Sequence, residues 1–413
     1  MHPALQGLLT IVLGVGGCVG YFYFSNQILD KVIFPAKGEN IGRNINRANM
    51  VRPWLFLLPA LLALGLYLAY PVFETLRLSV TERIPGGGSK FVGLDNYKQL
   101  VDEPKFWEAL KNNMLWLIVV PAASTAFGLL AAQLSDRIKW GNIAKSLIFM
   151  PMAISFVGAA VIWKLVYDTR PAGQDQIGVL NAVWLAFDEG SIWSTLVLTI
   201  FPIIFLIAFA GIVALVGWIF VKPMFGGAER NSVATYPLRL LVAVGGAWLI
   251  WKSITSVIGI ATVELPFGEP QTWLTIPFWN SFFLMAVLVW IQTGFAMVIL
   301  SAALRGIPEE TIEAAIVDGA NPFQVFFSIK VPQIMGTIVV VWTTITIVVL
   351  KVFDIVFAMT NGQWETQVLA NYMYDKLFRA NDWGVGSASA MVIMLLVTPI
   401  LVWNVYNARK EMR

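Results

Sequence analysis

The chain nearly lacks the two side chains that most often perform chemistry in proteins. Among its 413 residues there is one cysteine, Cys18, and one histidine, His2. One of each cannot form an intrachain disulfide, a Cys/His metal cluster or a catalytic histidine triad. We therefore expect no catalytic residue and no metal site, and we expect Cys18 to be a helix-packing residue.

Charge is also scarce. Charged residues make up 13% of the chain and hydrophobic residues 58%, with a mean hydropathy of +0.72. About one quarter of the residues in an ordinary soluble domain are charged, so this composition excludes a soluble domain. Backbone polar groups inside a hydrocarbon core must be bonded within a helix or a closed barrel. The composition predicts an all-α, polytopic membrane protein, and the net charge of +3 gives no reason to expect nucleic-acid binding.

A nucleotide-binding loop is missing as well. The phosphate-cradling pattern G-x4-G-K-[ST] does not occur, and the nearest segments, 86–90 and 141–146, lack the required order. If ATP drives this protein, ATP and Mg²⁺ must be bound by a partner ATPase. We expect this chain itself to hold no cofactor.

Long apolar segments are what the chain does have, and a bilayer needs roughly 20 residues per helix. They cover approximately residues 4–25, 52–73, 114–134, 144–166, 193–221, 238–262, 278–303, 336–358 and 387–407. The first has its basic residues after it rather than before it, so we expect a retained helix and not a signal peptide. About nine transmembrane helices are predicted.

The distribution of basic residues predicts the orientation. With the N-terminus outside, the inner loops and tail contain 16 Lys and Arg residues, and the outer loops contain 9. Cytoplasmic loops are enriched in these residues, so this orientation is favoured. We expect a multi-pass protein of a bacterial or archaeal inner membrane, with its N-terminus outside and its C-terminus in the cytoplasm.

A polar island, residues 305–332, interrupts the apolar segments on the predicted cytoplasmic side. Pro308 suits the first position of a helix, where its missing N–H is not needed. Gly319 can adopt a left-handed turn, and Asn321 followed by Pro322 is typical of the start of a second helix. The island is therefore predicted to fold as a helix, a glycine turn and a second helix.

The same island carries the spaced motif EAA-x3-G-x9-I-x-[LV]-P. The residues that keep this spacing, together with the aspartate before the glycine, are Glu313, Ala314, Ala315, Asp318, Gly319, Ile329 and Pro332. The motif resembles the coupling loop of ATP-binding-cassette importer permeases, although Val331 stands where that family usually has leucine. The resemblance implies that these residues dock an ATPase. The alternative is a capped loop between two helices with no partner.

The resemblance covers roughly residues 52–190 and 275–407. The sequences F-V-G-L-D-N-Y at 91–97 and K-V-F-D-I-V-F-A-M-T-N-G at 351–362 look like those of sugar-type, binding-protein-dependent permeases. A further shared run consists of Leu369, Tyr372, Tyr374 and Phe378. Where that family usually has T-x-G-G-P, this chain has Gly-Gln-Trp at 362–364. This variant most resembles permeases for α-glucosides and related glucosyl solutes.

Such permeases are type I importers with a core of six helices. The resemblance implies a second permease subunit in a heterodimer, an ATPase dimer, an extracytoplasmic solute-binding protein, and a sugar or glucosyl solute that is imported without bond chemistry. The extra helices would lie at the N-terminus and in an inserted hairpin, which we expect to pack against membrane lipid or an accessory protein. The expected parts are an extra helix with a basic linker (1–50), the first core half (51–190), the hairpin (191–275) and the second core half (276–413).

Polar groups inside a predicted span are candidates for the solute path, because they are costly in hydrocarbon. Lys351 and Asp354 are expected to face each other on one helix, either in the path or as a structural ion pair. Thr337, Thr344 and Lys351 recur every seven residues and share a stripe, unless the threonines only bond their own helix. The remaining candidates, which suit sugar hydroxyls and rings, are Trp290, Gln292, Thr293 and Asn361.

Three other functional classes fit the sequence less well than an importer permease. An ion- or proton-coupled secondary transporter would use Lys351 and Asp354 as a relay, but it leaves the polar island without a role. A membrane scaffold subunit fits the extra helices but not the polar stripe. An integral-membrane enzyme would need an acid, a base and a nucleophile grouped together, which the sequence does not show. The sequence therefore favours the permease subunit of an ATP-driven importer.

Overall fold

The computed structural model describes residues 3–35, 41–84, 88–136, 138–187, 191–222, 236–262 and 267–411. Within these ranges the chain is mostly helical, which confirms the all-α class. The strands described there are β1 (Thr81–Arg83) and β2 (Ser89–Phe91), which pair antiparallel. The chain divides into two compact units, Met1–Trp107 with Tyr372–Val405, and Glu108–Asn371 with Tyr406–Arg413.

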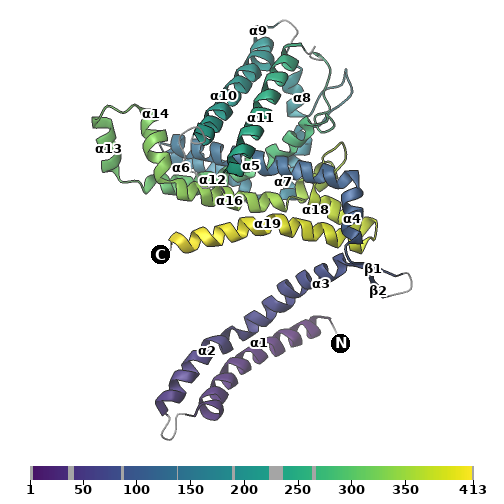
Figure 1. The fold of residues 1–413 in the computed structure, drawn as a ribbon, viewed down its shortest axis with the longest axis vertical. Coiled ribbons are helices and arrows are strands. Elements are labelled where there is room, and N and C mark those ends of the chain that lie inside the picture. Colours follow the sequence, from purple (N-terminus) through teal and green to yellow (C-terminus); the bar gives the residue numbers. More distant parts are fainter. Residues whose placement is uncertain are drawn as a thin grey trace. The chain divides into compact units, whose positions relative to one another are not determined.

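The first unit begins with two long helices that lie side by side (Figure 1). Arg52 of the second helix pairs with Asp30 after the first at 2.7 Å. The elements of this unit are α1 (Pro3–Ile28), the π-helical turn η1 (Leu29–Ile33), α2 (Ile41–Leu64), η2 (Gly65–Ala69), α3 (Tyr70–Ser79), β1, β2, α4 (Asp95–Asp102), η8 (Asp375–Arg379) and most of α19 (Trp383–Glu411). Cys18 is exposed on α1, so its predicted packing role is wrong for contacts within this chain.

The second unit contains most of the remaining helices, while α5 (Pro104–Ser135) and α18 (Leu369–Tyr374) cross the boundary between the units. Its elements are α6 (Gly141–Phe149), η3 (Met150–Ala153), α7 (Phe156–Val166), α8 (Val179–Trp184), α9 (Ile192–Ser194), η4 (Thr195–Ile200), α10 (Phe201–Val221), α11 (Tyr236–Thr262), α12 (Trp279–Arg305), α13 (Glu309–Val317), α14 (Pro322–Gln324), η7 (Val325–Lys330), α15 (Val331–Gln333), α16 (Met335–Leu350) and α17 (Asp354–Met359).

Helix α12 forms the centre of the second unit and packs against α6, α7, α16 and α17. About half of its residues, among them Leu288, are buried. Two glycines permit this close packing. A Cβ at Gly128 of α5 would lie 2.5 Å from the Cβ of Ala296, and a Cβ at Gly294 would lie 2.5 Å from the carbonyl oxygen of Ile148. Small residues at such contacts are typical of helices that associate within a membrane.

Six helical stretches in the described part of the chain are long and apolar enough to cross a membrane, or up to eight if two bent pairs each count as one. A polytopic helical membrane protein is thus confirmed, but the predicted count of nine is not. The last predicted segment lies in α19, whose apolar part, Trp383–Pro399, is shorter than a full span. The predicted hairpin contains α10 and α11, which pack against each other (Figure 1), and its connecting residues 223–235 lie outside the described ranges.

Two predicted spans are not single helices. The segment 144–166 bends by 105° before α7, where Ser155 caps the new helix by accepting a hydrogen bond from the amide of Gly158 at 3.1 Å. The segment 336–358 ends as a helix at Leu350, and α17 starts at Asp354. The prediction of one continuous helix there is wrong, because the intervening residues leave the helical conformation and a second helix N-terminus forms.

Candidate functional site: the helical elbow

The polar island folds into two short helical stretches joined by a tight turn, which we call the elbow (residues 309–333). Gly319 has a φ of +84°, the left-handed conformation that favours glycine. Its amide donates to the carbonyl of Ile316, and the amide of Ala320 donates to the carbonyl of Ala315, both at 3.0 Å. These are the two bonds of a Schellman motif, which satisfies free carbonyls at a helix end. The predicted glycine turn is confirmed.

The second helix of the elbow starts as the sequence predicts. The side-chain oxygen of Asn321 accepts from the amide of Gln324 at 2.9 Å, and the side chain of Gln324 accepts from the amide of Asn321 at 2.8 Å. This capping box satisfies two backbone donors, and Pro322 occupies the first turn. One detail differs, because Pro308 is the N-cap of α13 rather than its first helical residue. The elbow is therefore defined largely by its own caps.

Apolar side chains are displayed on both sides of the turn. Val317 is 86% exposed and Phe323 is 77% exposed. Glu313 and Ala314 are also exposed. Exposed apolar groups gathered on a polar segment are typical of an interaction site. The turn also encloses a shallow cavity of about 340 Å³, lined by Asp318, Gly319, Ala320, Gln324, Ser328 and Ile329.

The structure brings only part of the predicted motif together. Asp318, Gly319 and Ile329 share the shallow cavity, whereas the residues outside its lining are Glu313, Ala314, Ala315 and Pro332. The sequence analysis missed Val317 and Phe323. The available signal was their apolar character next to the turn of an otherwise polar segment.

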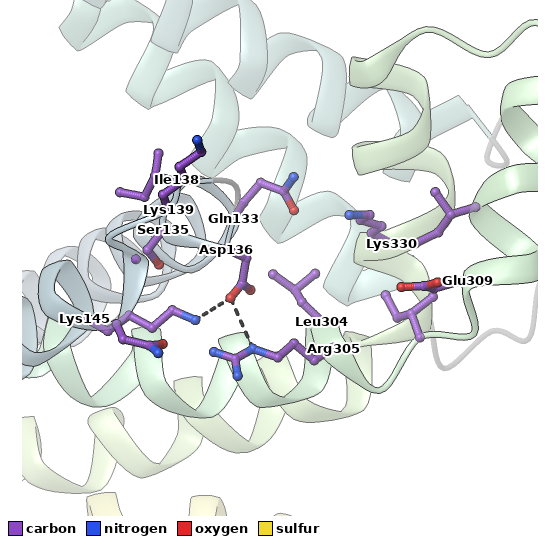
Figure 2. A pocket seen from close by; sticks show the side chains of 14 residues that line it. Gln133, Ser135, Asp136, Ile138, Lys139, Lys145, Leu304, Arg305, Glu309 and Lys330 are labelled. Atoms are coloured by element: carbon purple, nitrogen blue, oxygen red, sulfur yellow. Dashed lines mark hydrogen bonds and ion pairs between the residues drawn. The ribbon is translucent and has the colours of Figure 1, made fainter.

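An ion-pair network lies where α12 leads into the elbow, a point that we call the root of the elbow (Figure 2). Asp136, directly after α5, binds Lys145 of α6 and Arg305 at the end of α12, where Arg305 Nε lies 3.1 Å from Oδ1 of Asp136. Ser301, one turn before Arg305, accepts from Lys145 Nζ at 2.7 Å and lies 3.3 Å from both Asp136 oxygens. The network therefore joins three helices at the point where the polar island begins.

The charge of Asp136 is held by this network. Burial disfavours the carboxylate, but Lys145 and Arg305 outweigh that effect and lower the pKa of Asp136 below its ordinary value of 3.8. Asp136 is therefore ionised at physiological pH. Its side chain is 26% exposed and that of Lys145 is 12% exposed. Asp136 and Arg305 are 169 residues apart, so no local sequence pattern could have predicted their contact.

The solute-path candidates on α12 and α16 lie in different surroundings. The hydroxyls of Thr293 and Thr344 each donate to the carbonyl four residues earlier at 2.7 Å, as membrane threonines often do. Trp290 packs edge-on against Trp163, with ring centres 5.8 Å apart. Gln292 is buried, at 7% exposure, whereas Thr344 is exposed. These four candidates therefore differ in burial and in the contacts that they make.

The predicted pairing of Lys351 with Asp354 is wrong. The two residues lie on opposite sides of the break between α16 and α17, and the ion pairs among the described side chains do not include them. Pairing at a spacing of three requires a continuous helix, which is absent here. Lys351 instead follows a helix C-terminus and Asp354 opens a helix N-terminus, so each charge complements the nearby helix dipole.

Asn361 belongs to a loop with a strained backbone, residues 361–367. Positive φ angles occur at Asn361, Gly362, Trp364 and Glu365. For residues other than glycine, such conformations cost on the order of 1–3 kcal/mol each, and they persist only where neighbouring contacts impose them. Trp364 is nevertheless 47% exposed. The loop therefore presents an aromatic ring from a backbone that the surrounding structure holds in place.

Buried asparagines supply the contacts that hold this loop. Asn112 of α5 donates to the carbonyls of Glu365 and Gln367, both at 2.8 Å. Asn280 of α12, at 0% exposure, donates to the carbonyl of Trp364 at 2.5 Å. Two core helices therefore fix the loop through side chains that are far from it in sequence.

We expect Asn280→Ala to lower the free energy of unfolding by about 1–3 kcal/mol, because the carbonyl of Trp364 loses its buried donor. The measurement is thermal unfolding of the purified protein in detergent. Asn142→Ala is the matched control, since Asn142 is exposed and its amide side chain makes no such contact. Equal melting temperatures for Asn280→Ala and the unmodified protein would contradict this account of the loop.

Comparison with known proteins agrees with this architecture. A family model for the binding-protein-dependent transport system inner membrane component matches residues 178–411. The chain is 51% identical to the alpha-glucoside transport system permease protein AglF of Rhizobium meliloti (strain 1021), over 100% of this chain and 99% of that protein. It is 37% identical to the osmoprotective compounds uptake permease protein GgtC of Synechocystis sp. (strain ATCC 27184 / PCC 6803 / Kazusa), over 87% of this chain and 100% of the relative.

A solved structure shows the same fold. It is a bacterial ABC transporter involved in the import of the acidic polysaccharide alginate, and its similar chain gives a TM-score of 0.59 at 16% identity. The match covers 91% of this chain and 100% of that chain.

Within the described residues, no group of three or more His, Cys, Asp or Glu side chains is placed to hold a metal ion.

Proposed function

This chain belongs to the family of binding-protein-dependent transport system inner membrane components, as a permease subunit of an ATP-binding-cassette importer, and on that premise we propose that its elbow docks the ATPase. The observation that carries the proposal is the exposure of Val317 and Phe323 on a turn that is fixed by its own caps. Apolar anchors on a rigid support suit a groove in a partner protein. The small Ala314 beside them permits close approach.

The network at the root of the elbow supports a mechanical role. Force applied to α13 would reach α12 through Arg305, and from Arg305 it would reach α5 and α6 through Asp136 and Lys145. ATP binding by an ATPase dimer would bring the elbows of two permease subunits together and open the solute path outward, and hydrolysis would reset it. Such a cycle is a two-state equilibrium that nucleotide and binding protein bias from opposite sides.

The proposed partners and solute follow from the family and its relatives. We propose that a solute-binding protein delivers an α-glucoside or a glucosylated solute to a heterodimer of this chain with a second permease subunit. Support for the solute class comes from AglF, an alpha-glucoside permease by name, to which the chain is 51% identical over its length. The N-terminus would lie outside and the C-terminus in the cytoplasm, which places the elbow on the side where ATP is found.

We further propose that Thr344 of α16 and Lys351, which directly follows this helix, line the solute path at the contact with the second permease. Thr344 and Lys351 are exposed in this chain. A charged group in a membrane helix is costly against lipid, so it favours a partner or a hydrated path. The other candidates for solute contact remain Trp290, Gln292, Thr293, Asp354 and Asn361. Their hydroxyl, amide, charged and aromatic groups suit a sugar.

The energy source tests this function directly. Cells that express the importer should lose uptake of a labelled α-glucoside when ATP is depleted while the ion gradients are clamped, because the elbow has no role without a nucleotide-driven partner. Collapse of the ion gradients at constant ATP should leave uptake unchanged. The opposite pattern would identify a secondary transporter and would refute the proposed function.

A further inference from the structure

We propose that the open cavity beside the root of the elbow binds the phosphate group of an anionic membrane lipid. The cavity has a volume of about 610 Å³ and lies between the ends of α5 and α12 and the starts of α6 and α13. This site goes beyond ATPase docking, because its ligand comes from the membrane and its residues are largely distinct from the exposed apolar tip of the elbow.

The lining of the cavity has a net positive charge, which favours an anionic ligand. Its charged lining residues are Lys139, Lys145, Arg305, Lys330, Asp136 and Glu309. Four are basic and two are acidic, which leaves a net charge of +2. The start of α6 at Gly141 also lines the cavity, and the N-terminus of a helix adds positive potential. A ligand that carries one or two negative charges would balance this lining.

Donors remain available for such a ligand. Asp136 engages Lys145 and Nε of Arg305, and Nη2 of Arg305 bonds Ser301, which leaves Nη1 of the guanidinium for a further acceptor. Lys139 and Lys330 form no ion pair among the described side chains. Figure 2 shows the ammonium group of Lys330 directed across the cavity and Lys139 at its rim. A phosphate between Lys330 and Arg305 would accept charge-assisted hydrogen bonds from both.

The surroundings indicate that the phosphate belongs to a lipid. Two candidate membrane spans, Pro104–Ser135 and Trp279–Arg305, end at the cavity, which puts it near the lipid headgroups in the predicted topology. Next to the cavity, Trp140, Ile143 and Leu147 recur at helical spacing and are 58–62% exposed. They form an apolar face against which acyl chains can pack. Basic pockets between membrane helices on the cytoplasmic side are known to hold anionic headgroups.

A bound lipid would connect the elbow to the first half of the permease. Lys330 lies in the second helical stretch of the elbow, and Lys139 lies in the loop between α5 and α6. A phosphate group that contacts Lys330 and Arg305, with Lys139 at the rim of its site, would restrain the elbow alongside the Asp136 network. The lipid would therefore act as a non-protein element of the joint between the elbow and the membrane helices.

The test measures lipid retention by native mass spectrometry of the purified full chain supplied with phosphatidylglycerol or phosphatidylcholine. The unmodified protein should retain phosphatidylglycerol preferentially. Combined Lys139→Gln and Lys330→Gln should weaken that retention by at least about tenfold, since each basic residue near a lipid surface contributes to binding. Lys31→Gln with Arg47→Gln is the matched control, because it removes two exposed charges outside the cavity and should leave retention unchanged.

Three results would overturn the proposal. Equal retention of the two lipids, or equal retention of phosphatidylglycerol by the cavity variant and the unmodified protein, would show that the cavity is no anionic lipid site. Displacement of phosphatidylglycerol by inorganic phosphate at equal concentration would assign the site to a soluble phosphate instead. The two double variants should have the same unfolding temperature in phosphatidylcholine alone. Such agreement would show that a loss of phosphatidylglycerol binding is not caused by a loss of folding.

Discussion

Val317→Glu combined with Phe323→Glu is expected to weaken ATPase binding by at least about 30-fold and to abolish uptake. Truncating or charging an anchor residue at the centre of an interface typically costs about 2 kcal/mol or more of binding free energy. A loss of about 2 kcal/mol corresponds to a Kd that is about 30-fold higher. Both side chains are largely exposed, at 86% and 77%, so the fold does not depend on them. The measurement is a titration of the purified permease complex with its ATPase in detergent.

Phe91→Glu is the matched control for this variant. Phe91 is 72% exposed on β2, on the opposite side of the predicted topology from the elbow. It should bind the ATPase normally, as should the unmodified protein. Unchanged ATPase affinity in the elbow variant, together with normal thermal unfolding, would remove the docking role from the elbow.

Asp136→Asn is expected to reduce uptake by about tenfold or more while the ATPase still binds. The substitution leaves Lys145, at 12% side-chain exposure, with its hydrogen bond to Ser301 but without an anionic partner, and the loss of a charged partner from a largely buried group costs about 1–3 kcal/mol. Arg305 contributes less, because its side chain is 59% exposed and solvent screens the pair. The physical reason for the lost uptake is that the end of α12, which leads into α13, is no longer fixed to α5 and α6 when the ATPase moves.

A double-mutant cycle separates this coupling from a general loss of stability. Asp136→Asn, Arg305→Gln and their combination should be non-additive in uptake by at least about 0.5 kcal/mol, as residues in one network usually are. Arg77→Gln is the control, because Arg77 forms an exposed pair with Glu74 within one helix. If the combined variant loses uptake as the simple sum of the two single losses, the network does not transmit motion.

The elbow was predictable because its signals are local. A glycine at a position with positive φ determines a turn, and an asparagine followed by proline determines a helix start. Both signals affect only the residues next to them. Gly319 has a φ of +84°, as the predicted turn requires. Asn321 and Gln324 form a capping box where the sequence predicts the start of the second helix. The membrane class was equally accessible, since it depends on composition alone.

Features that depend on tertiary contacts could not be predicted from the sequence. The break after Leu350 lies in a mostly apolar segment that reads as one helix, although Lys351 and Asp354 stand at the two new helix ends. The pairing of Asp136 with Arg305 spans 169 residues. Asn280 donates to the carbonyl of Trp364 and Asn112 to that of Glu365, and nothing about tryptophan itself indicates the positive φ that Trp364 has in this loop.

A site-specific cross-link tests most directly whether the elbow touches the ATPase. In a chain with Cys18→Ala, which removes the sole cysteine, Val317→Cys can be labelled with a benzophenone maleimide inside the assembled importer. Illumination should join this chain to a protein that carries a nucleotide-binding loop, and the same probe at Phe91→Cys should not. An elbow probe that yields no such product, in a complex that still hydrolyses ATP and takes up solute, would contradict the account.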